Sequence, residues 1–298
     1  MTKLFQRLLA PLAAALALVA PGAATAKAPA AKPALWAVSD RDTTIYLFGT
    51  IHLLPEKYQW RTARFDEAVK GSNQLVVETI VDEKNPMPIV AALQSLGFSP
   101  GLPPLAQRLP PSQRPALARA IAKSGVPAAA FDRMETWAAA FMLLGNQFKA
   151  MGLQGGQGVE AVLRANFAND NKPIGELETN AEQLGYFDRL PESAQRALLE
   201  GAIMDTPTSS KEFGGMLDAW SRGNVAGIAH AFDHDMEASP ALKASLIRQR
   251  NANWSKWIEQ RLSQPGTVML AVGAGHLAGK DSVIAMLQKD GYTVRRVQ

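Results

Sequence analysis

Cysteine is absent from the 298 residues of this chain. Its absence excludes disulfide bonds, thiolate zinc sites and lipid attachment at a cysteine. Hydrophobic residues make up 47% of the sequence, which is enough to bury a full core, and the length lies between one large domain and two small ones. Stability must therefore come from core packing, with a bound metal as a possible addition.

Long apolar runs are scarce, and the run at the amino terminus is short for a membrane span. Lys3 and Arg7 precede the apolar stretch 8–19, and small residues at 24–26 follow it, as in a secretory signal. We expect residues 1–26 to be a signal peptide cleaved near Ala26, which makes the protein exported and periplasmic. A membrane anchor is the alternative, but stable membrane insertion after cleavage is not expected.

Excess charge is also lacking. The formal net charge is +4, and removal of Lys3 and Arg7 with the signal lowers it to +2. Such a small excess gives little attraction to phosphate polymers, so nucleic acid is not an expected partner.

The remaining chain is predicted to be one α/β (α+β) domain with a mixed central β-sheet flanked by helices. Residues 27–34 are rich in Ala, Pro and Lys and indicate a flexible linker, and the domain covers 35–298. Apolar runs at 35–39 and 43–49 flank a turn and predict a hairpin. From about 86 to 170 the pattern changes to Ala- and Leu-rich helical segments, which indicates a helical insertion or cap.

Two of the four histidines lie in matching surroundings. The segments Tyr46–Leu53 and Leu270–Leu277 each read as an apolar strand that runs into Gly-x-x-His-Leu. A strand followed by a glycine turn places the next polar side chain at the carboxyl edge of the sheet, where open α/β sheets bind ligands. His52 and His276 are therefore expected to meet in one crevice.

Two acidic residues also follow predicted strands. Glu78 comes after the apolar run 74–77, and Glu178 follows the short strand 173–177. Two imidazoles with one or two carboxylates suit a divalent ion with an open position for water. Such an ion activates water, and a carboxylate that does not bind it can accept the proton, which is hydrolase chemistry.

Each of these residues also has a purely structural interpretation. Either histidine alone is better explained as a turn residue that bonds a backbone carbonyl, and only the pair favours a shared site. Glu78 and Glu178 can equally cap the helices that follow them. Glu176 lies two residues before Glu178 and competes for the same role.

Other polar residues are candidates from their position. Glu160 follows Gly158-Val159 in the first turn of a predicted helix, where it favours the helix dipole and can also reach a metal. Arg250 and Asn251 lie in a long amphipathic helix predicted for 241–262. The structural interpretation is that they lie on the solvated face of this helix. The functional interpretation is that they polarise a substrate carbonyl or bind a substrate carboxylate.

Taken together, these motifs resemble the TraB/PrgY/GumN family, in particular its bacterial GumN-like branch. The segments that carry the resemblance are Trp36 with Asp40, Phe48–Pro55, Gly175–Thr179, Arg250–Trp254 and Val272–Gly279. The family is related to the Tiki metalloproteases, which are membrane-tethered and cleave Wnt ligands, and more distantly to the EreA/ChaN-like folds. The resemblance therefore implies a metallopeptidase with a divalent metal ion, with manganese or cobalt as suitable as zinc.

By position, the Tiki-like histidines match His52 and His276, and the acidic positions match Glu78 and Glu178. Glu160 matches an acid that follows Gly-Val in many relatives. These five residues are the metal-site candidates that the resemblance implies. Glu78 and Glu178, together with Arg250 and Asn251 of the matching helix motif, are the catalytic candidates.

The sequence thus favours an exported metal-dependent hydrolase, a Tiki-like peptidase acting on peptides or proteins. The Wnt-type substrate does not transfer, because no membrane stalk is evident here. One alternative is a non-enzymatic periplasmic protein that binds a peptide or haem in the same crevice. Another is an accessory factor for envelope polysaccharide production, with the helical cap as a docking surface.

Overall fold

A six-stranded sheet lies at the centre of the computed structural model, which describes residues 31–298 except 83–84, 154, 205 and 238. The predicted signal peptide and residues 27–30 of the predicted linker lie outside the described residues. The strands are β1 (Leu35–Ser39), β2 (Thr43–Thr50), β3 (Gln74–Val77), β4 (Ile174–Glu176), β5 (Gly266–Gly273) and β6 (Val294–Arg296). Their spatial order is β4-β3-β5-β2-β1-β6.

Helices make up most of the rest of the described chain. The α-helices are α1 (Ala63–Gly71), α2 (Met87–Leu96), α3 (Arg114–Ser124), α4 (Ala128–Asp132), α5 (Thr136–Ala150), α6 (Val159–Asn169), α7 (Asn180–Asp188), α8 (Glu192–Ala202), α9 (Thr206–Ser221), α10 (Val225–Glu237), α11 (Pro240–Lys243), α12 (Arg250–Leu262) and α13 (Val283–Lys289). Short 3₁₀ segments are η1 (Leu105–Arg108), η2 (Pro111–Gln113), η3 (Gly155–Gln157) and η5 (Ala274–Leu277), and η4 (Ala244–Gln249) is π-helical.

The sheet is mixed, as the sequence predicted. Strands β4, β3, β5 and β2 are parallel to one another, whereas β1 pairs antiparallel with both β2 and β6. The predicted hairpin is confirmed, with Leu35 opposite Phe48. Asp40 shapes its turn, because its Oδ1 accepts the backbone N–H groups of Asp42 and Thr43 at 3.1 and 2.8 Å. The structure therefore confirms the predicted α/β class.

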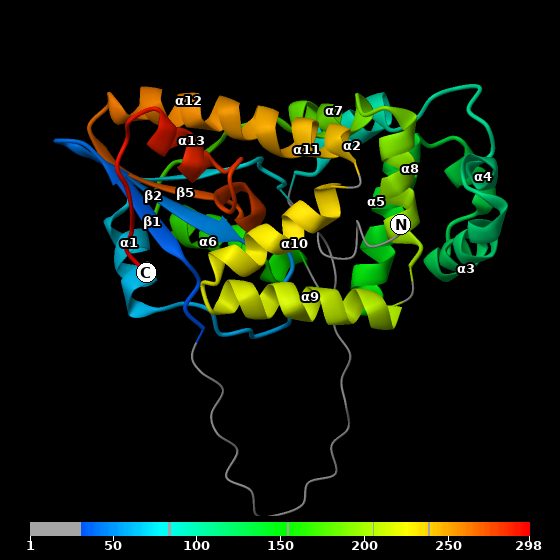
Figure 1. Cartoon of the computed structure of the whole chain (residues 1–298), viewed down its shortest axis with the longest axis horizontal. Helices are drawn as coiled ribbons and strands as arrows, with labels where there is room; N and C mark the ends of the chain where they lie inside the picture. The colour runs from blue at the N-terminus through cyan, green and yellow to red at the C-terminus, as the bar shows by residue number, and fades with distance from the viewer. Residues whose placement is uncertain (1–30, 83–84, 154, 205, 238) are drawn as a thin grey trace, which may run out of the picture.

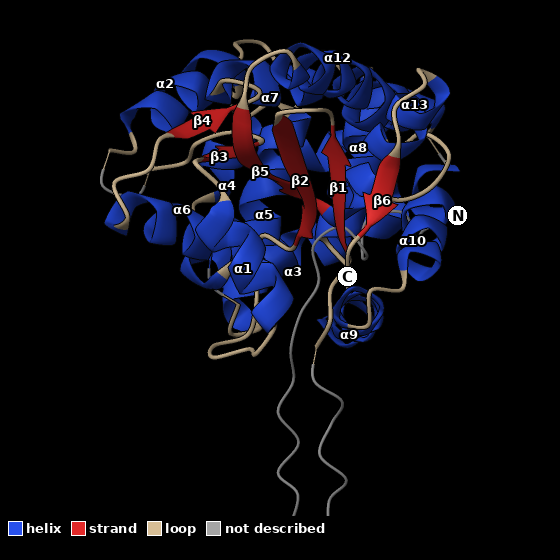
Figure 2. Cartoon of the chain, turned by 90° about the vertical axis from the view of Figure 1, so that its left-hand side faces the viewer, coloured by secondary structure: helices blue, strands red, loops and turns tan. Residues whose placement is uncertain are grey.

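Both faces of the sheet are buried, which explains why its inner strands are apolar without interruption. Along β5, Val268, Leu270 and Val272 point to one side, and Met269 and Ala271 to the other. Helices α12 and α13 pack on the first side, and α1, α5 and α6 belong to the core on the second side. Figure 2 shows the sheet between these two layers.

Between β3 and β4 the described residues form helices and loops, apart from an isolated bridge between Phe98 and Met134. Helix α5 from this stretch packs against α8, and the two stand at one end of the molecule beside α3 and α4 (Figure 1). The domain boundaries given above stay a prediction.

The helix predicted for 241–262 is not one regular helix. The structure divides it into α11, the π-helical segment η4 and α12. A π-turn inserts an extra residue into the helical repeat, which rotates everything that follows, and amphipathic spacing does not reveal it. This rotation occurs directly before Arg250.

None of the helices in the described residues combines the length and the hydropathy that crossing a bilayer requires.

Candidate functional site

The two Gly-x-x-His segments lie side by side. Strands β2 and β5 pair in parallel so that Gly49 is opposite Val272 and Thr50 is opposite Gly273. A side chain at Gly49 would stand 3.0 Å from the Cα atom of Ala274, so the glycine permits this close approach. His52 and His276 therefore leave the same edge of the sheet from adjacent strands.

The two glutamates leave that edge from the next strands. Glu78 follows β3, which pairs with β5, and Glu178 follows β4, which pairs with β3. The backbone N–H of Glu178 donates to the carbonyl of Glu78 at 2.9 Å. Four neighbouring parallel strands thus deliver the two histidines and two glutamates predicted from the sequence to one crevice.

Arg250 stands at the centre of this group and pairs with both glutamates. Its Nε is 3.0 Å from each Glu178 oxygen, and its Nη2 lies 2.8 Å from Glu178 Oε2 and 2.7 Å from Glu78 Oε2. Trp254 Nε1 donates to Glu178 Oε1 at 3.0 Å. All of these charged side chains are buried, so the pairing is needed to offset their desolvation.

The two carboxyl groups differ in environment. Burial alone would raise the pKa of Glu78, but nearby positive charge, above all that of Arg250, outweighs it and holds this pKa well below its usual range. Glu78 Oε1 also accepts the backbone N–H of Gly273 at 2.6 Å. Burial raises the pKa of Glu178, and the hydrogen bonds from Arg250 counter only part of that rise.

His276 has a defined tautomer. Its Nε2 lies 3.1 Å from Arg250 Nη1, which can only donate, so Nε2 carries the lone pair. Its Nδ1 therefore carries the proton and donates to Asn251 Oδ1 at 2.6 Å. Asn251 Nδ2 in turn donates to the carbonyl of Asp281 at 2.7 Å, which fixes the amide orientation. Burial, with Arg250 acting in the same direction, lowers the pKa of His276 to about 3, so the ring is neutral.

His52 is held by an acid from another element. Its Nδ1 lies 2.7 Å from Glu160 Oε1, and Thr50 donates its hydroxyl to the same oxygen. The N–H of Val159, at the start of α6, donates to the carbonyl of Ile51 at 3.1 Å and joins this helix to the loop. The carboxylate of Glu160 raises the pKa of His52 above its usual range, although 56% of the side chain is exposed.

Because Gly273 has no side chain, the space between Glu78, His276 and His52 stays open. A Cβ atom on Gly273 would stand 3.0 Å from Glu78 Oε1, 3.6 Å from His276 Cδ2 and 3.7 Å from His52 Nε2. The three side chains therefore surround one small volume. In the described part of the chain, no group of three or more His, Asp or Glu side chains is spaced so that it could hold a metal ion as the side chains stand.

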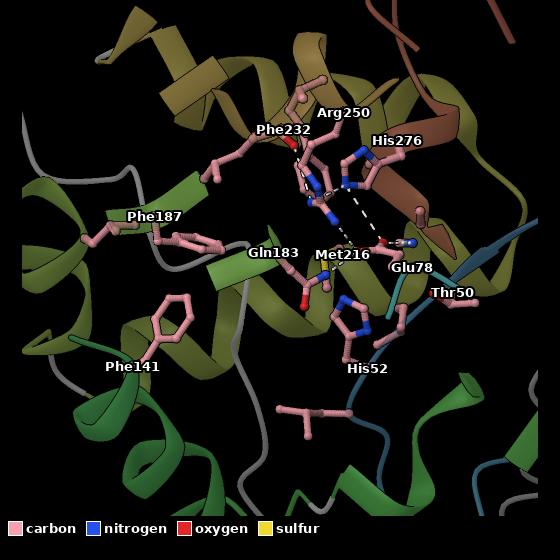
Figure 3. A pocket seen from close by; sticks show the side chains of 18 of the residues that line it. Thr50, His52, Glu78, Phe141, Gln183, Phe187, Met216, Phe232, Arg250 and His276 are labelled. Carbon is pink, nitrogen blue, oxygen red and sulfur yellow. Dashed lines mark hydrogen bonds and ion pairs between the residues drawn. The ribbon is translucent and has the colours of Figure 1, made fainter. Parts of the chain in front are cut away.

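The crevice opens into a pocket of about 290 Å³. Its lining includes His52, Glu78, Arg250 and His276, and Figure 3 shows these side chains facing a common space. Glu160, Glu178 and Asn251 do not line the pocket; they contact residues that do. The ring of Phe232 packs on the turn before His276, where a Cβ at Gly275 would stand only 2.5 Å from it.

Sequence reasoning missed three participants. Trp254, which the sequence analysis named only within the resemblance, donates to Glu178, and Thr50 donates to Glu160. Gln183 was not singled out, yet its Nε2 donates to Glu78 Oε2 at 3.2 Å. Gln183 lies in α7, the helix that follows Glu178, but a glutamine inside a helix carries no signal of its own. Thr179 and Glu182 form a capping box at the start of this helix.

The competing residue Glu176 has a different position. Its Oε2 accepts the backbone N–H of Ile80 at 2.7 Å and so holds the loop after β3. Among the described residues, its side-chain hydrogen bonds go to Thr79 and Ile80 and not to His52 or His276. Glu178, and not Glu176, belongs to the cluster around Arg250.

Comparison with known proteins places this arrangement in a family. Residues 34–296 match the TraB/PrgY/gumN family. Uncharacterized protein YbaP of Escherichia coli (strain K12) is 24% identical over 247 residues, which cover 82% of this chain and 87% of YbaP, and YbaP of Shigella flexneri matches equally. A metalloprotease TIKI homolog of Amphimedon queenslandica is 40% identical over 58 residues, 19% of this chain and 11% of that protein. No solved structure matches significantly, so the expected likeness to EreA/ChaN-like folds stays a prediction. The match over nearly the whole described chain shows that it belongs to the TraB/PrgY/gumN family.

Proposed function

We propose that this protein is a metal-dependent hydrolase that cleaves peptides. The observation that carries the proposal is the convergence of two neighbouring imidazoles and a buried carboxylate around the space left by Gly273. The partial similarity to a metalloprotease TIKI homolog supports the same reaction class. The protein would act after export, which the amino-terminal sequence predicts.

The donor chemistry fits a divalent ion held by His52, His276 and Glu78. Each imidazole has its Nδ1 engaged, that of His52 by Glu160 and that of His276 by Asn251, so Nε2 is the nitrogen through which each ring would bind an ion. Nitrogen and carboxylate donors together suit manganese, cobalt or zinc. To bind through His276, an ion must displace the contact between Nε2 and Arg250 Nη1.

Charge balance supports the same assignment. The cluster contains three acidic side chains, Glu78, Glu160 and Glu178, against the one guanidinium of Arg250. With both imidazoles neutral and the acids ionised, two negative charges remain for a dication to balance. Without an ion, protonation of His52, which the neighbouring Glu160 carboxylate favours, offsets one of these two negative charges.

The residues have separate roles in this proposal. A bound ion lowers the pKa of a coordinated water towards neutrality and polarises a carbonyl. Glu178 holds Arg250 through both of its oxygens, so it has no free oxygen to offer as a ligand. Arg250 Nη1 is the donor placed to stabilise negative charge on a substrate oxygen. Glu160 and Asn251 orient the two imidazoles.

The test is hydrolysis of an unstructured protein such as casein by the purified protein. We expect fragments when manganese, cobalt or zinc is added and none when a chelator is present. His52→Ala, His276→Ala and Glu78→Gln should abolish cleavage, whereas His230→Ala on α10, outside the pocket, should not. Cleavage that survives the chelator, or survives both histidine substitutions, would contradict the proposal.

A non-catalytic binding protein is the main alternative. It would hold a peptide in the same pocket without cleaving it, and it would bind equally well with or without an ion. A haem-binding protein would instead show a strong Soret band after incubation with haem. Both outcomes can be measured on the same samples.

A further inference from the structure

The pocket has two chemically different ends. His52, Glu78, Arg250 and His276 carry all of the ionisable groups in its lining. The rest of the lining is almost wholly apolar and includes Phe141, Phe187, Leu198, Phe213 and Met216. In Figure 3, Phe141 and Phe187 lie on the side away from His276 and Glu78.

The apolar end is built from rings that fix one another. The centroids of Phe141 and Phe187 are 4.6 Å apart with their planes at 70°, an edge-to-face contact. Trp137 stacks near Phe187 and packs edge-on against Phe141. Trp137 is fully buried, and its Nε1 donates to Asp188 Oδ1 at 3.3 Å. These rings therefore form a ready-made apolar surface, which is the usual way a pocket selects a large apolar group.

One face of α7 connects the two ends. Gln183 and Phe187 are four residues apart in this helix and so share a face. Gln183 contacts the catalytic cluster through Glu78, and Phe187 contacts Phe141. A molecule that follows this face passes from the polar end to the aromatic end, and Leu184 of the same helix also lines the pocket.

Gln183 also presents a defined acceptor. The Glu78 carboxylate, which is paired with Arg250, can only accept hydrogen bonds. The group of Gln183 that faces it must therefore be the amide nitrogen. Its Oε1 therefore points away from Glu78, and no described residue donates a hydrogen bond to it. An acceptor in this place suits the backbone N–H of a peptide, whereas the ester of an acyl chain has no such donor.

We propose that the pocket selects a peptide residue with a large apolar side chain next to the scissile bond. The side chain packs against the surface that Phe141 and Phe187 form together, and the N–H of the same residue donates to Gln183 Oε1. The inference rests on the hydrolase function proposed above and names its substrate class. A charged side chain at that position would lose its hydration without gaining a partner, because every ionisable lining group stands at the other end.

The experiment uses capped pentapeptides, acetyl-Ala-Ala-Xaa-Ala-Ala-amide, in which Xaa is Leu, Phe, Ala, Asp or Lys. The Leu and Phe peptides should be cleaved about 10- to 100-fold more efficiently (kcat/KM) than the Ala peptide, as burial of such a side chain implies. The Asp and Lys peptides should be poorer than the Ala peptide. Binding of each peptide is measured in parallel by saturation-transfer NMR on metal-free protein.

Two variants test the named contacts. Phe187→Ala should reduce the preference for Leu and Phe over Ala by about 10-fold, whereas Phe98→Ala should leave it unchanged, because Phe98 is 44% exposed and outside the pocket. An ester oxygen in place of the Xaa N–H should weaken binding about 10-fold in the parent. Gln183→Met should weaken binding of the amide peptide. In this variant, the ester peptide should bind as tightly as the amide peptide. Thermal unfolding verifies that each variant is folded.

The outcomes separate the two proposals. Efficient cleavage that does not depend on Xaa would overturn the inference and leave the hydrolase proposal standing. Selective binding of the Leu and Phe peptides without cleavage under any metal, lost in Phe187→Ala, would support the inference and refute hydrolysis. Neither binding nor cleavage of any peptide would overturn both.

Discussion

His276 and Arg250 meet through a single contact, in which Nη1 of the guanidinium donates to Nε2 of the imidazole at 3.1 Å. The contact occupies the same lone pair that a metal ion would need. In the absence of an ion, Arg250 thus joins both glutamates and one histidine into one buried network.

Arg250→Met should destabilise the fold strongly. The substitution leaves the Glu78 and Glu178 carboxylates buried without their cation, which typically costs about 3–5 kcal/mol of unfolding free energy. Adding Glu178→Gln should restore part of the loss by removing one of these charges. Arg248→Met is the control, because this arginine is 53% exposed and pairs with Asp281, so about 0–1 kcal/mol is expected. Urea unfolding provides the values, and equal losses for Arg250→Met and Arg248→Met would refute this account of the network.

Asn251→Ala should weaken metal binding without removing any proposed ligand. The amide fixes the Nδ1–H tautomer of His276, and loss of such a partner usually lowers metal affinity about 10- to 100-fold. Asn253→Ala, two positions along the same helix, is the control, since Asn253 bonds Tyr186 instead. Isothermal titration calorimetry with manganese or zinc measures the metal affinity of both variants. Unchanged affinity in Asn251→Ala would show that the amide does not orient the ring.

Gly273→Ala should crowd the proposed ion without disturbing distant structure. The added methyl would stand 3.0 Å from Glu78 Oε1 and 3.7 Å from His52 Nε2, so we expect metal affinity to fall by at least about 10-fold. Gly145→Ala is the control, because a methyl there meets nothing within 4 Å, and replacing a helix-interior glycine should stabilise the fold by about 0.5–1 kcal/mol. Metal affinity as high in Gly273→Ala as in Gly145→Ala would argue against the space beside Gly273 as the ion site.

The capping box before Gln183 should make stability depend on pH. The backbone N–H of Thr179, followed by its hydroxyl, lowers the pKa of Glu182. A lowered folded-state pKa means that the stabilisation is present above the unfolded pKa of about 4.3 and is lost as pH falls through the folded-state pKa. Glu182→Gln should therefore cost a few tenths of a kcal/mol, up to about 1 kcal/mol, at pH 7 and almost nothing near pH 2.

Urea unfolding at a series of pH values measures the difference between Glu182→Gln and the parent. Glu182→Ala, which also removes the hydrogen bonds to Thr179, should retain a deficit at low pH. A Glu182→Gln deficit that does not shrink between pH 5 and pH 2 would contradict the assigned cause.

The strand ends could be predicted from the sequence because local pattern determines them. The apolar run before Gly49 and that before Gly273 each require a buried strand, and the residue after a strand must leave at its carboxyl edge. The order of strands follows from long-range pairing, and the repeated Gly-x-x-His motif predicted only that the two histidines meet in one crevice, not that their strands pair. The family resemblance led to the same residues and is confirmed.

What the sequence could not show is which polar groups would pair with one another. Arg250 faces the glutamates because η4 rotates the helix before it, and no residue pattern in 244–249 indicates a π-turn. Gln183 was missed for a related reason. A glutamine within a helix carries no signal of its own, and its role depends on Glu78 arriving from a strand about a hundred residues earlier.

Metal content is the measurement that tests the central claim most directly. The purified protein is equilibrated with manganese, cobalt or zinc, dialysed briefly and analysed for metal, beside His52→Ala, His276→Ala and the control His230→Ala. The account predicts nearly one ion per chain in the parent and in His230→Ala, and a loss in both other variants while their thermal unfolding stays close to that of the parent. An absence of metal in the parent, or full occupancy in His52→Ala, would contradict it.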